Sequence, residues 1–422
     1  MTLIKQQSFI DLSKTVRGIL FIAPIPVFLY CIPAFYQGSD FGFLYLSSSI
    51  AFLLALYISV CVRTPLLVFI QSNTSQTESS KRINVNRVSI ILCYLAAVSY
   101  IIILSSFSLY KIALVASGQA TSLYTVTIGL QVSGDSSFVS RIFTAYMPSG
   151  LARGIIFALL TSSQLINFSS ILKPRNLIVF SCLLTAILSI LSSGGVASLV
   201  GIVQIILFVL IAPIYTILVR FFKNLKLSTK SLGVYFALVV AMAVTVYISN
   251  VYSRLKNLDG ILDVIGKYFE LVYNYQYVIY NYVNQAGTSG SGGLASLFPI
   301  QLEAFQSNAL SLFKYHLDPV MLKGVWLGMT GRQLLEFGSE FQPLVMFFST
   351  LTYFLILKFV ANALLPSIFA SRVWLFLVFS AIISCWTSDP MTGIPVAFFV
   401  VIGYTLIIKI LSSGKYARGV IE

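Results

Sequence analysis

The sequence predicts an all-α integral membrane protein that crosses the bilayer about ten times. Of its 422 residues, 58% are hydrophobic and the mean hydropathy is +0.91, which is more apolar sequence than a soluble core can use. Several apolar runs reach or approach the length of about 20 residues that crosses a hydrocarbon core as a helix. The alternation of apolar and polar residues typical of barrel strands is absent.

We expect ten spans, and a longer helix broken elsewhere would raise the number to eleven or twelve. The expected spans are 18–36, 42–62, 88–109, 150–171, 177–192, 197–219, 232–250, 343–365, 373–387 and 393–411. The first run follows basic residues as a signal peptide would, but its length, its prolines and the lack of a small-residue cleavage site indicate a retained span. Residues 1–422 are therefore expected to form a single membrane domain.

Charge is distributed unequally between the two sides of the predicted bundle. The chain has 27 Lys and Arg residues against 13 Asp and Glu residues, a net charge of +14. With a cytoplasmic N-terminus, about two thirds of the basic residues fall on the cytoplasmic side, and Lys358 and Lys409 extend toward it. This orientation puts both termini in the cytoplasm. It also assigns the excess positive charge to topology and not to nucleic-acid binding.

Two of the predicted outer loops are long, residues 110–149 and residues 251–342. The longer loop carries most of the outer-side acids and His316, the only histidine in the chain. A transporter more often carries ionisable groups near the midplane of the membrane. Their concentration in one outer loop therefore favours chemistry at that face.

The longer loop begins with a tyrosine-rich stretch, residues 262–285, that is amphipathic as a helix. It is suited to lie at the membrane interface, and its rings are also suited to stack on sugars. The following "GTSGSGG", residues 287–293, is either a passive linker or the hinge of a lid. A lone histidine is often structural, but His316 lies among carboxylates, where its near-neutral pKa suits proton transfer.

The densest charge cluster lies in "GMTGRQLLEFGSEFQPL", residues 328–344. If this stretch is helical, Arg332, Glu336 and Glu340 fall at i, i+4 and i+8 and share one face. One interpretation is an Arg–Glu ladder at the outer end of the eighth span. The other is that Arg332 binds an anion with its planar fork while Glu336 or Glu340 takes a hydroxyl proton.

Two further arginines fall on the predicted outer side. Arg141 lies in the first long loop, and Arg153 lies in "SGLARGIIF" near the outer end of the fourth span. Gly150 and Gly154 flank Arg153 and would let a neighbouring helix come close. An arginine this deep in a span is a candidate functional residue.

Together these features resemble the Wzy-type O-antigen (oligosaccharide repeat unit) polymerases of bacterial inner membranes. The architecture of the whole chain carries the resemblance. It is specific over "SLFPIQLEAF" (296–305) and "GRQLLEFGSEFQPLVMFFSTLTYFLI" (331–356), which look like the end of that family's large periplasmic loop and its continuation into the next span. Membership would imply a C-type glycosyltransferase fold (GT-C) and a role in lipopolysaccharide biosynthesis at the inner (cytoplasmic) membrane.

The resemblance also implies substrates and partners. The donor would be a growing glycan on undecaprenyl pyrophosphate, and the acceptor a lipid-linked repeat unit. The family's pyrophosphate-binding arginines would correspond to Arg153 and Arg332, with Arg141 a third candidate. His316 occupies a loop comparable to the one that holds the histidine of the related O-antigen ligases. Membrane lipids and a chain-length regulator protein would be partners, and nucleic acid would not.

Glycosyl transfer from a pyrophosphate needs a stabilised leaving group and a base for the attacking hydroxyl. The sequence has no Asp-x-Asp motif and no cluster of histidine and carboxylates that would hold a metal. We therefore expect arginines in place of a metal, no cofactor, and a base among His316, Glu336 and Glu340.

Three other functions are compatible with parts of this pattern. A lipid-linked oligosaccharide flippase would have short outer loops and charges lining a central cavity, which the long loop 251–342 argues against. An O-antigen ligase would differ in its acceptor. A non-enzymatic membrane assembly partner would not need clustered arginines and carboxylates.

The topology itself is testable. Because the positive-inside rule puts the loop 251–342 outside and the basic stretch around Lys226 inside, reporter fusions at Ser291 and at Lys226 should report opposite compartments. Finding both reporters in the same compartment would overturn the predicted topology.

Overall fold

The computed structural model describes residues 20–21, 23–62, 87–121, 123, 126–127, 146–161, 174–193, 201, 204–205, 272–274, 276–281, 283–284, 330–365, 367–385 and 393–413. Every regular element within these residues is a helix, and none is a strand. This confirms the predicted all-helical class over the described part of the chain.

Five of the described helices are long and apolar enough to cross a membrane. They are α4 (Ser39–Cys61), α6 (Arg87–Ala116), α10 (Pro174–Ser193), α17 (Gly331–Leu364) and α19 (Ile394–Ser412). Each coincides with a predicted span. The helices α9 (Met147–Thr161) and α18 (Ser367–Ser384) are shorter and apolar, and they overlap the predicted spans 150–171 and 373–387. The predicted spans 197–219 and 232–250 lie outside the described residues, apart from 201 and 204–205.

The predicted first span, 18–36, is not one continuous helix. It contains two short helices, α2 (Pro24–Leu29) and α3 (Ile32–Gln37), with a turn at Tyr30 and Cys31 between them. Pro33 explains the break, because it has no backbone N–H to donate and its ring clashes with the carbonyl four residues earlier. Whether these two helices together cross the membrane, as the predicted span requires, stays a prediction.

The helices also extend into both predicted outer loops. α6 continues through Ala116, so the predicted first loop, 110–149, is helical over its first seven residues, and it is helical again from Met147. α17 begins at Gly331, inside the predicted loop 251–342. These helices extend beyond the most apolar windows because turns of mixed composition can continue a helix past the hydrocarbon core.

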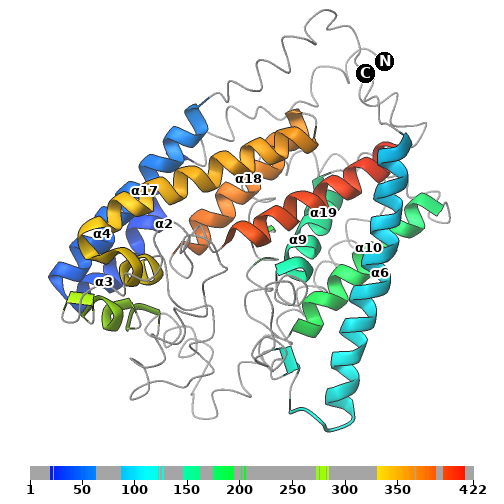
Figure 1. The fold of residues 1–422 in the computed structure, drawn as a ribbon, viewed down its shortest axis with the longest axis horizontal. Helices are drawn as coiled ribbons and strands as arrows, with labels where there is room; N and C mark the ends of the chain where they lie inside the picture. The colour runs from blue at the N-terminus through cyan, green and yellow to red at the C-terminus, as the bar shows by residue number, and fades with distance from the viewer. Residues whose placement is uncertain are drawn as a thin grey trace, which may run out of the picture.

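Most of the described helices form two packed groups that meet at α18 and α19 (Figure 1). In the first group, α4 and α17 run side by side, and α2, α3 and α18 pack against them. In the second group, α9 packs between α10 and α19, while α6 packs against α10 and α19. The rings of Phe157 on α9 and Phe376 on α18 stack with centroids 4.4 Å apart, which links the two groups through the core.

The helices α9 and α19 approach one another closely, and this contact depends on glycine. A β-carbon on Gly150 would lie 2.6 Å from the carbonyl oxygen of Val396, and one on Gly154 would overlap the backbone of α19. On the other side, a β-carbon on Gly403 would lie 2.7 Å from the carbonyl oxygen of Leu151. The predicted role of Gly150 and Gly154 in admitting a neighbouring helix is confirmed, and α19 is that helix.

Lysines bind the ends of neighbouring helices at one end of the bundle. The ammonium of Lys358 on α17 donates to the carbonyl oxygens of Ser59 (3.0 Å) and Val62 (2.9 Å), where α4 ends. The ammonium of Lys409, in the last turn of α19, donates to the hydroxyl of Ser89 (3.2 Å) at the start of α6. Both lysines thus reach helix ends that the predicted topology puts on the cytoplasmic side.

Two arginines also bind the ends of neighbouring helices at this end of the bundle. Arg175 at the start of α10 donates to the carbonyl oxygen of Leu411 (3.2 Å) near the end of α19. Arg372 near the start of α18 donates to the carbonyl oxygen of Thr161 (3.3 Å), where α9 ends. The C-terminal end of a helix carries partial negative charge and open carbonyls, so these cations stabilise the ends they bind.

The glycine contact gives a prediction about stability. Gly403→Ala should force α9 and α19 apart, because its β-carbon would lie too close to the Leu151 carbonyl, at a cost of about 1–3 kcal/mol. Gly393, immediately before α19, gives the control Gly393→Ala, because the new β-carbon would lie 3.7 Å from the Tyr353 hydroxyl, an ordinary contact distance. Thermal unfolding of the detergent-purified protein should show a lower midpoint for Gly403→Ala and an unchanged one for Gly393→Ala. Equal midpoints would contradict the glycine-dependent contact.

Candidate functional site

Arg153 lies on α9, between the two glycines that contact α19. Its guanidinium packs against Gly201, where a β-carbon would overlap the guanidinium nitrogen Nε. Its charge also interacts with the phenol of Tyr353 on α17. Tyr353 is 5% exposed, and its hydroxyl approaches Gly393 at the start of α19. An arginine enclosed by apolar helices is costly, which is why such residues usually have a function.

The chain reverses direction within α17, at Gly338. This residue has φ 79° and ψ 172°, a backbone conformation that is essentially restricted to glycine. The reversal divides α17 into residues 331–337, which we call the arm, and residues 339–364, which we call the α17 body. A straight α17 would put Arg332 about 30 Å from Tyr353, at a rise of about 1.5 Å per residue.

Buried hydrogen bonds hold the arm against the α17 body. Nε2 of Gln333 donates to the hydroxyl of Ser349 (3.1 Å), and Nε2 of Gln342 donates to Oε1 of Gln333 (2.9 Å). All three side chains are buried. Ser349 lies one helical turn before Tyr353 on the same face. The arm spans about 10 Å and Tyr353 lies about 22 Å beyond Gly338, so the backbone at Arg332 returns to roughly 15 Å from the Tyr353 position.

The residue before the arm is tied to the tyrosine-rich stretch. The backbone N–H and the hydroxyl of Thr330 both donate to Oε1 of Gln276 (3.3 and 2.8 Å), and Nε2 of Gln276 donates to the Val272 carbonyl oxygen (3.2 Å). Beyond the reversal, the hydroxyl of Ser339 donates to Oδ1 of Asn284 (3.2 Å). The arm is therefore attached at its start and at its reversal, and it also contacts the α17 body.

The tyrosine-rich stretch packs against α4. The ring of Tyr273 lies 5.5 Å from that of Tyr45, and the ring of Tyr277 lies 5.6 Å from that of Phe41. Tyr273 is fully buried, and burial raises the pKa of its phenol above the ordinary value. Both tyrosines therefore support the helix packing, and Tyr273 has no exposed ring face for a sugar. Tyr280 is half-buried and borders an open groove.

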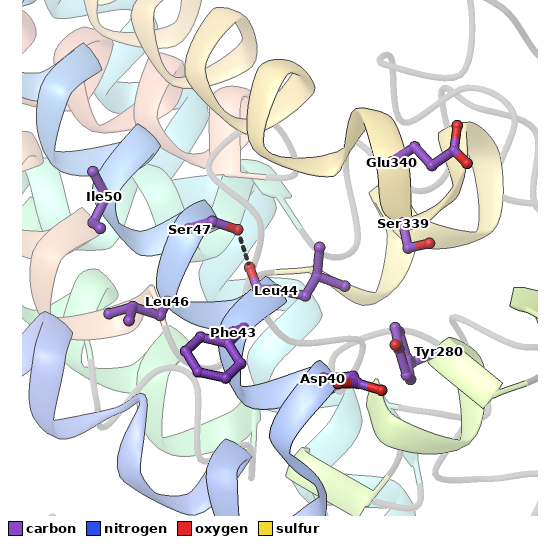
Figure 2. Close-up of a pocket in the computed structure, with 9 residues that line it drawn as sticks. All are labelled: Asp40, Phe43, Leu44, Leu46, Ser47, Ile50, Tyr280, Ser339 and Glu340. Atoms are coloured by element: carbon purple, nitrogen blue, oxygen red, sulfur yellow. Dashed lines mark hydrogen bonds between the residues drawn. The ribbon is translucent and has the colours of Figure 1, made fainter.

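The groove has a volume of about 540 Å³ and lies between the start of α4, the start of the α17 body and Tyr280 (Figure 2). Asp40 of α4 and Glu340 of α17 lie on facing sides of it. Both carboxylates lie in the first turn of a helical segment, where the helix dipole favours negative charge. The other described lining residues are Phe43, Leu44, Leu46, Ser47, Ile50 and Ser339. Carboxylates accept hydrogen bonds from hydroxyl groups and repel phosphates, so the groove suits a hydroxyl-bearing ligand.

The predicted charge cluster is divided by the reversal at Gly338. Arg332 and Glu336 belong to the arm, whereas Glu340 belongs to the α17 body and is exposed at the groove. The prediction that all three share one helix face was wrong, because the backbone at Gly338 is not helical and Glu340 follows it. The spacing rule assumes an uninterrupted helix.

The remaining predicted site residues are spread along the chain. Glu340 precedes Tyr353 by about 20 Å of helix, so the structure does not bring Glu340 and Arg153 together. His316 and Arg141 lie outside the described residues. Of the predicted pyrophosphate-binding residues, Arg153 and the backbone of Arg332 are the two that the structure brings toward one region.

Sequence reasoning missed the polar residues that organise this region. Gln333, Gln342, Ser349 and Tyr353 are all buried within or beside α17. A signal was present, because Ser349 and Tyr353 are four residues apart in an apolar run and therefore share a helix face. The pairing of Gln333 with Ser349 left no such signal, since it depends on the reversal at Gly338.

The fold and the composition place this chain in the class of α-helical membrane proteins. Comparison with protein-family models, with curated proteins and with solved structures finds no match to it.

Proposed function

We propose that the protein is a metal-independent glycosyltransferase that polymerises lipid-linked oligosaccharide repeat units at the periplasmic face of a bacterial inner membrane. The observation that carries the proposal is the paired arginine region. Arg153 is enclosed by the helix core beside Tyr353, and the arm returns the backbone of Arg332 toward the same region. An enclosed arginine, with a second arginine on an element that folds back toward it, suits a ligand with more than one negative charge, such as a pyrophosphate.

In the proposed reaction, a hydroxyl oxygen of the acceptor sugar bonds to the anomeric carbon of the donor glycan. The bond between that carbon and the pyrophosphate oxygen breaks, and undecaprenyl pyrophosphate leaves with the electron pair. Arg153 and Arg332 stabilise the charge of the leaving group, the task that a metal ion has in many such enzymes. A base among His316, Glu336 and Glu340 takes the hydroxyl proton.

The groove supports an acceptor site separate from the arginines. Its carboxylates can accept hydrogen bonds from sugar hydroxyls, and Tyr280 offers a ring face. The same carboxylates would repel the donor pyrophosphate. The acceptor sugar and the donor pyrophosphate would therefore bind at different places along α17. Glu340 borders this groove and is therefore the described carboxylate best placed to meet an acceptor hydroxyl.

Deletion of the gene in its own host tests the proposed function. A polymerase mutant should still attach a single repeat unit to the lipopolysaccharide core, because flipping and ligation remain intact. Loss of all repeat units from the core would instead indicate a flippase or a ligase. Unchanged long chains would reject a role in this pathway.

The arginines give a direct prediction. Arg153→Ala or Arg332→Ala leaves part of the pyrophosphate unpaired at a cost of about 2–5 kcal/mol, which slows turnover by tens to thousands of fold. Arg→Lys keeps the charge without the bidentate fork and should give intermediate activity. The readout is lipopolysaccharide banding in the complemented deletion strain, with protein levels checked by blot.

Arg175→Ala is the matched control, because it removes an arginine at the opposite end of the bundle. It should leave chain length near that of the wild type. Long chains from the Arg153→Ala, Arg332→Ala double variant would reject the pyrophosphate-binding role.

A second prediction concerns the base. His316→Ala or Glu336→Ala should shorten the polymer far more than Glu270→Ala does, since loss of a general base costs about 10²–10⁴ in rate. Glu340→Ala belongs in the same series. Wild-type banding from a variant at normal membrane levels removes that residue as the base.

A further inference from the structure

The arm combines a pivot with a polar attachment. Gly338 supplies the reversal, and the side-chain amide of Gln333 contacts two partners at once. Its NH₂ group donates to Ser349 and its carbonyl oxygen accepts from Gln342, so one side chain joins the arm to two turns of the α17 body. With Gln333 only 1% exposed, water cannot readily replace these bonds if they are lost.

We infer that Gln333 is a positioning residue, which docks the arm on Ser349 and thereby holds the backbone of Arg332 on the side of Gly338 that leads toward Tyr353 and Arg153. This inference rests on the proposed function, since it assigns the docked arm to the pyrophosphate-binding state. Glutamine suits the role because its amide donates and accepts at the same time, whereas alanine does neither. Because Arg332 is adjacent to Gln333 in the arm, its backbone moves together with that of Gln333.

A docked arm and an extended arm differ in the distance between Arg332 and Tyr353. With the arm docked, the backbone of Arg332 lies roughly 15 Å from Tyr353, and with the arm extended along the helix axis it would lie about 30 Å away. Of the two arrangements, the docked one brings the backbone of Arg332 closer to Tyr353 and Arg153, as a shared pyrophosphate requires. The docked arm is therefore the active arrangement, and release of the arm should weaken binding of the donor.

Disulfide trapping tests the docking without any assay of function. In a background with Cys61→Ser and Cys93→Ser, which removes the two cysteines that are not buried, Gln333→Cys and Ser349→Cys should form a disulfide under mild oxidation. The control pairs Gln333→Cys with Phe348→Cys, because Phe348 is the adjacent residue but is 56% exposed on another face of the helix. Efficient cross-linking of the control and none of the Ser349 pair would overturn the docked geometry.

The same disulfide then tests whether docking is the active state. Polymerisation by the purified full-length variant, with a lipid-linked repeat unit as substrate, should be retained when the disulfide is closed and should fall about tenfold when it is reduced. A closed form that is inactive and regains activity on reduction would mean that the arm must leave Ser349, which overturns the inference.

A double-mutant cycle distinguishes positioning from a general structural role. Gln333→Ala should raise the KM for the lipid pyrophosphate donor about tenfold, and adding Arg332→Ala should give little further loss, because Arg332 is already displaced. Independent, multiplying effects would reject the inference. Ser349→Ala, which removes only the acceptor, repeats the cycle if Gln333→Ala does not fold.

These outcomes separate the inference from the proposed function. If Arg153→Ala and Arg332→Ala impair polymerisation while Gln333→Ala and Ser349→Ala leave the donor KM unchanged, the positioning role is wrong and the function stands. If the arginine variants polymerise normally, the proposed function fails, whatever the cross-linking shows about the arm.

Discussion

The close contact between α9 and α19 is the constraint on which the candidate site depends. Gly150 and Gly154 on one helix and Gly403 on the other let the two backbones meet without intervening side chains. Arg153 lies between the two α9 glycines, so the contact sets the depth and the direction of its backbone. A larger residue at these positions would separate the helices and move the guanidinium away from Tyr353.

Apart from Arg153 and Lys111, the charged side chains whose contacts are described above lie at one end of the bundle or the other. Lys358, Arg175 and Arg372 bind carbonyl groups near the C-terminal ends of α4, α19 and α9. Asp40 and Glu340 lie in first turns at the opposite end, beside the groove. Each charge thus complements the dipole of a helix end. The positive-inside rule also predicts basic residues at the end where Lys358, Arg175 and Arg372 lie. The predicted topology and the capping of helix ends therefore favour the same placement of these residues.

The reversal at Gly338 converts a linear stretch of sequence into a folded-back element. It lets polar side chains on the arm and on the α17 body satisfy one another in an apolar interior, where unpaired amides are costly. It also divides the charge cluster, so that Arg332 belongs to the arm while Glu340 borders the groove.

The sequence by itself determined the helical membrane class, five of the spans and the glycines beside Arg153, because length, apolar content and small-residue spacing are local properties of the chain. It also indicated which end of the bundle is basic. It did not determine the break in the first span or the division of the cluster at residues 328–344, although Pro33 and Gly338 were visible, because neither residue alone shows which way the chain turns. The partners of Arg153 and of Gln333 were decided only by the tertiary structure. Gly201, Tyr353 and Ser349 are distant from them in the chain, and packing of separate helices alone brings them together.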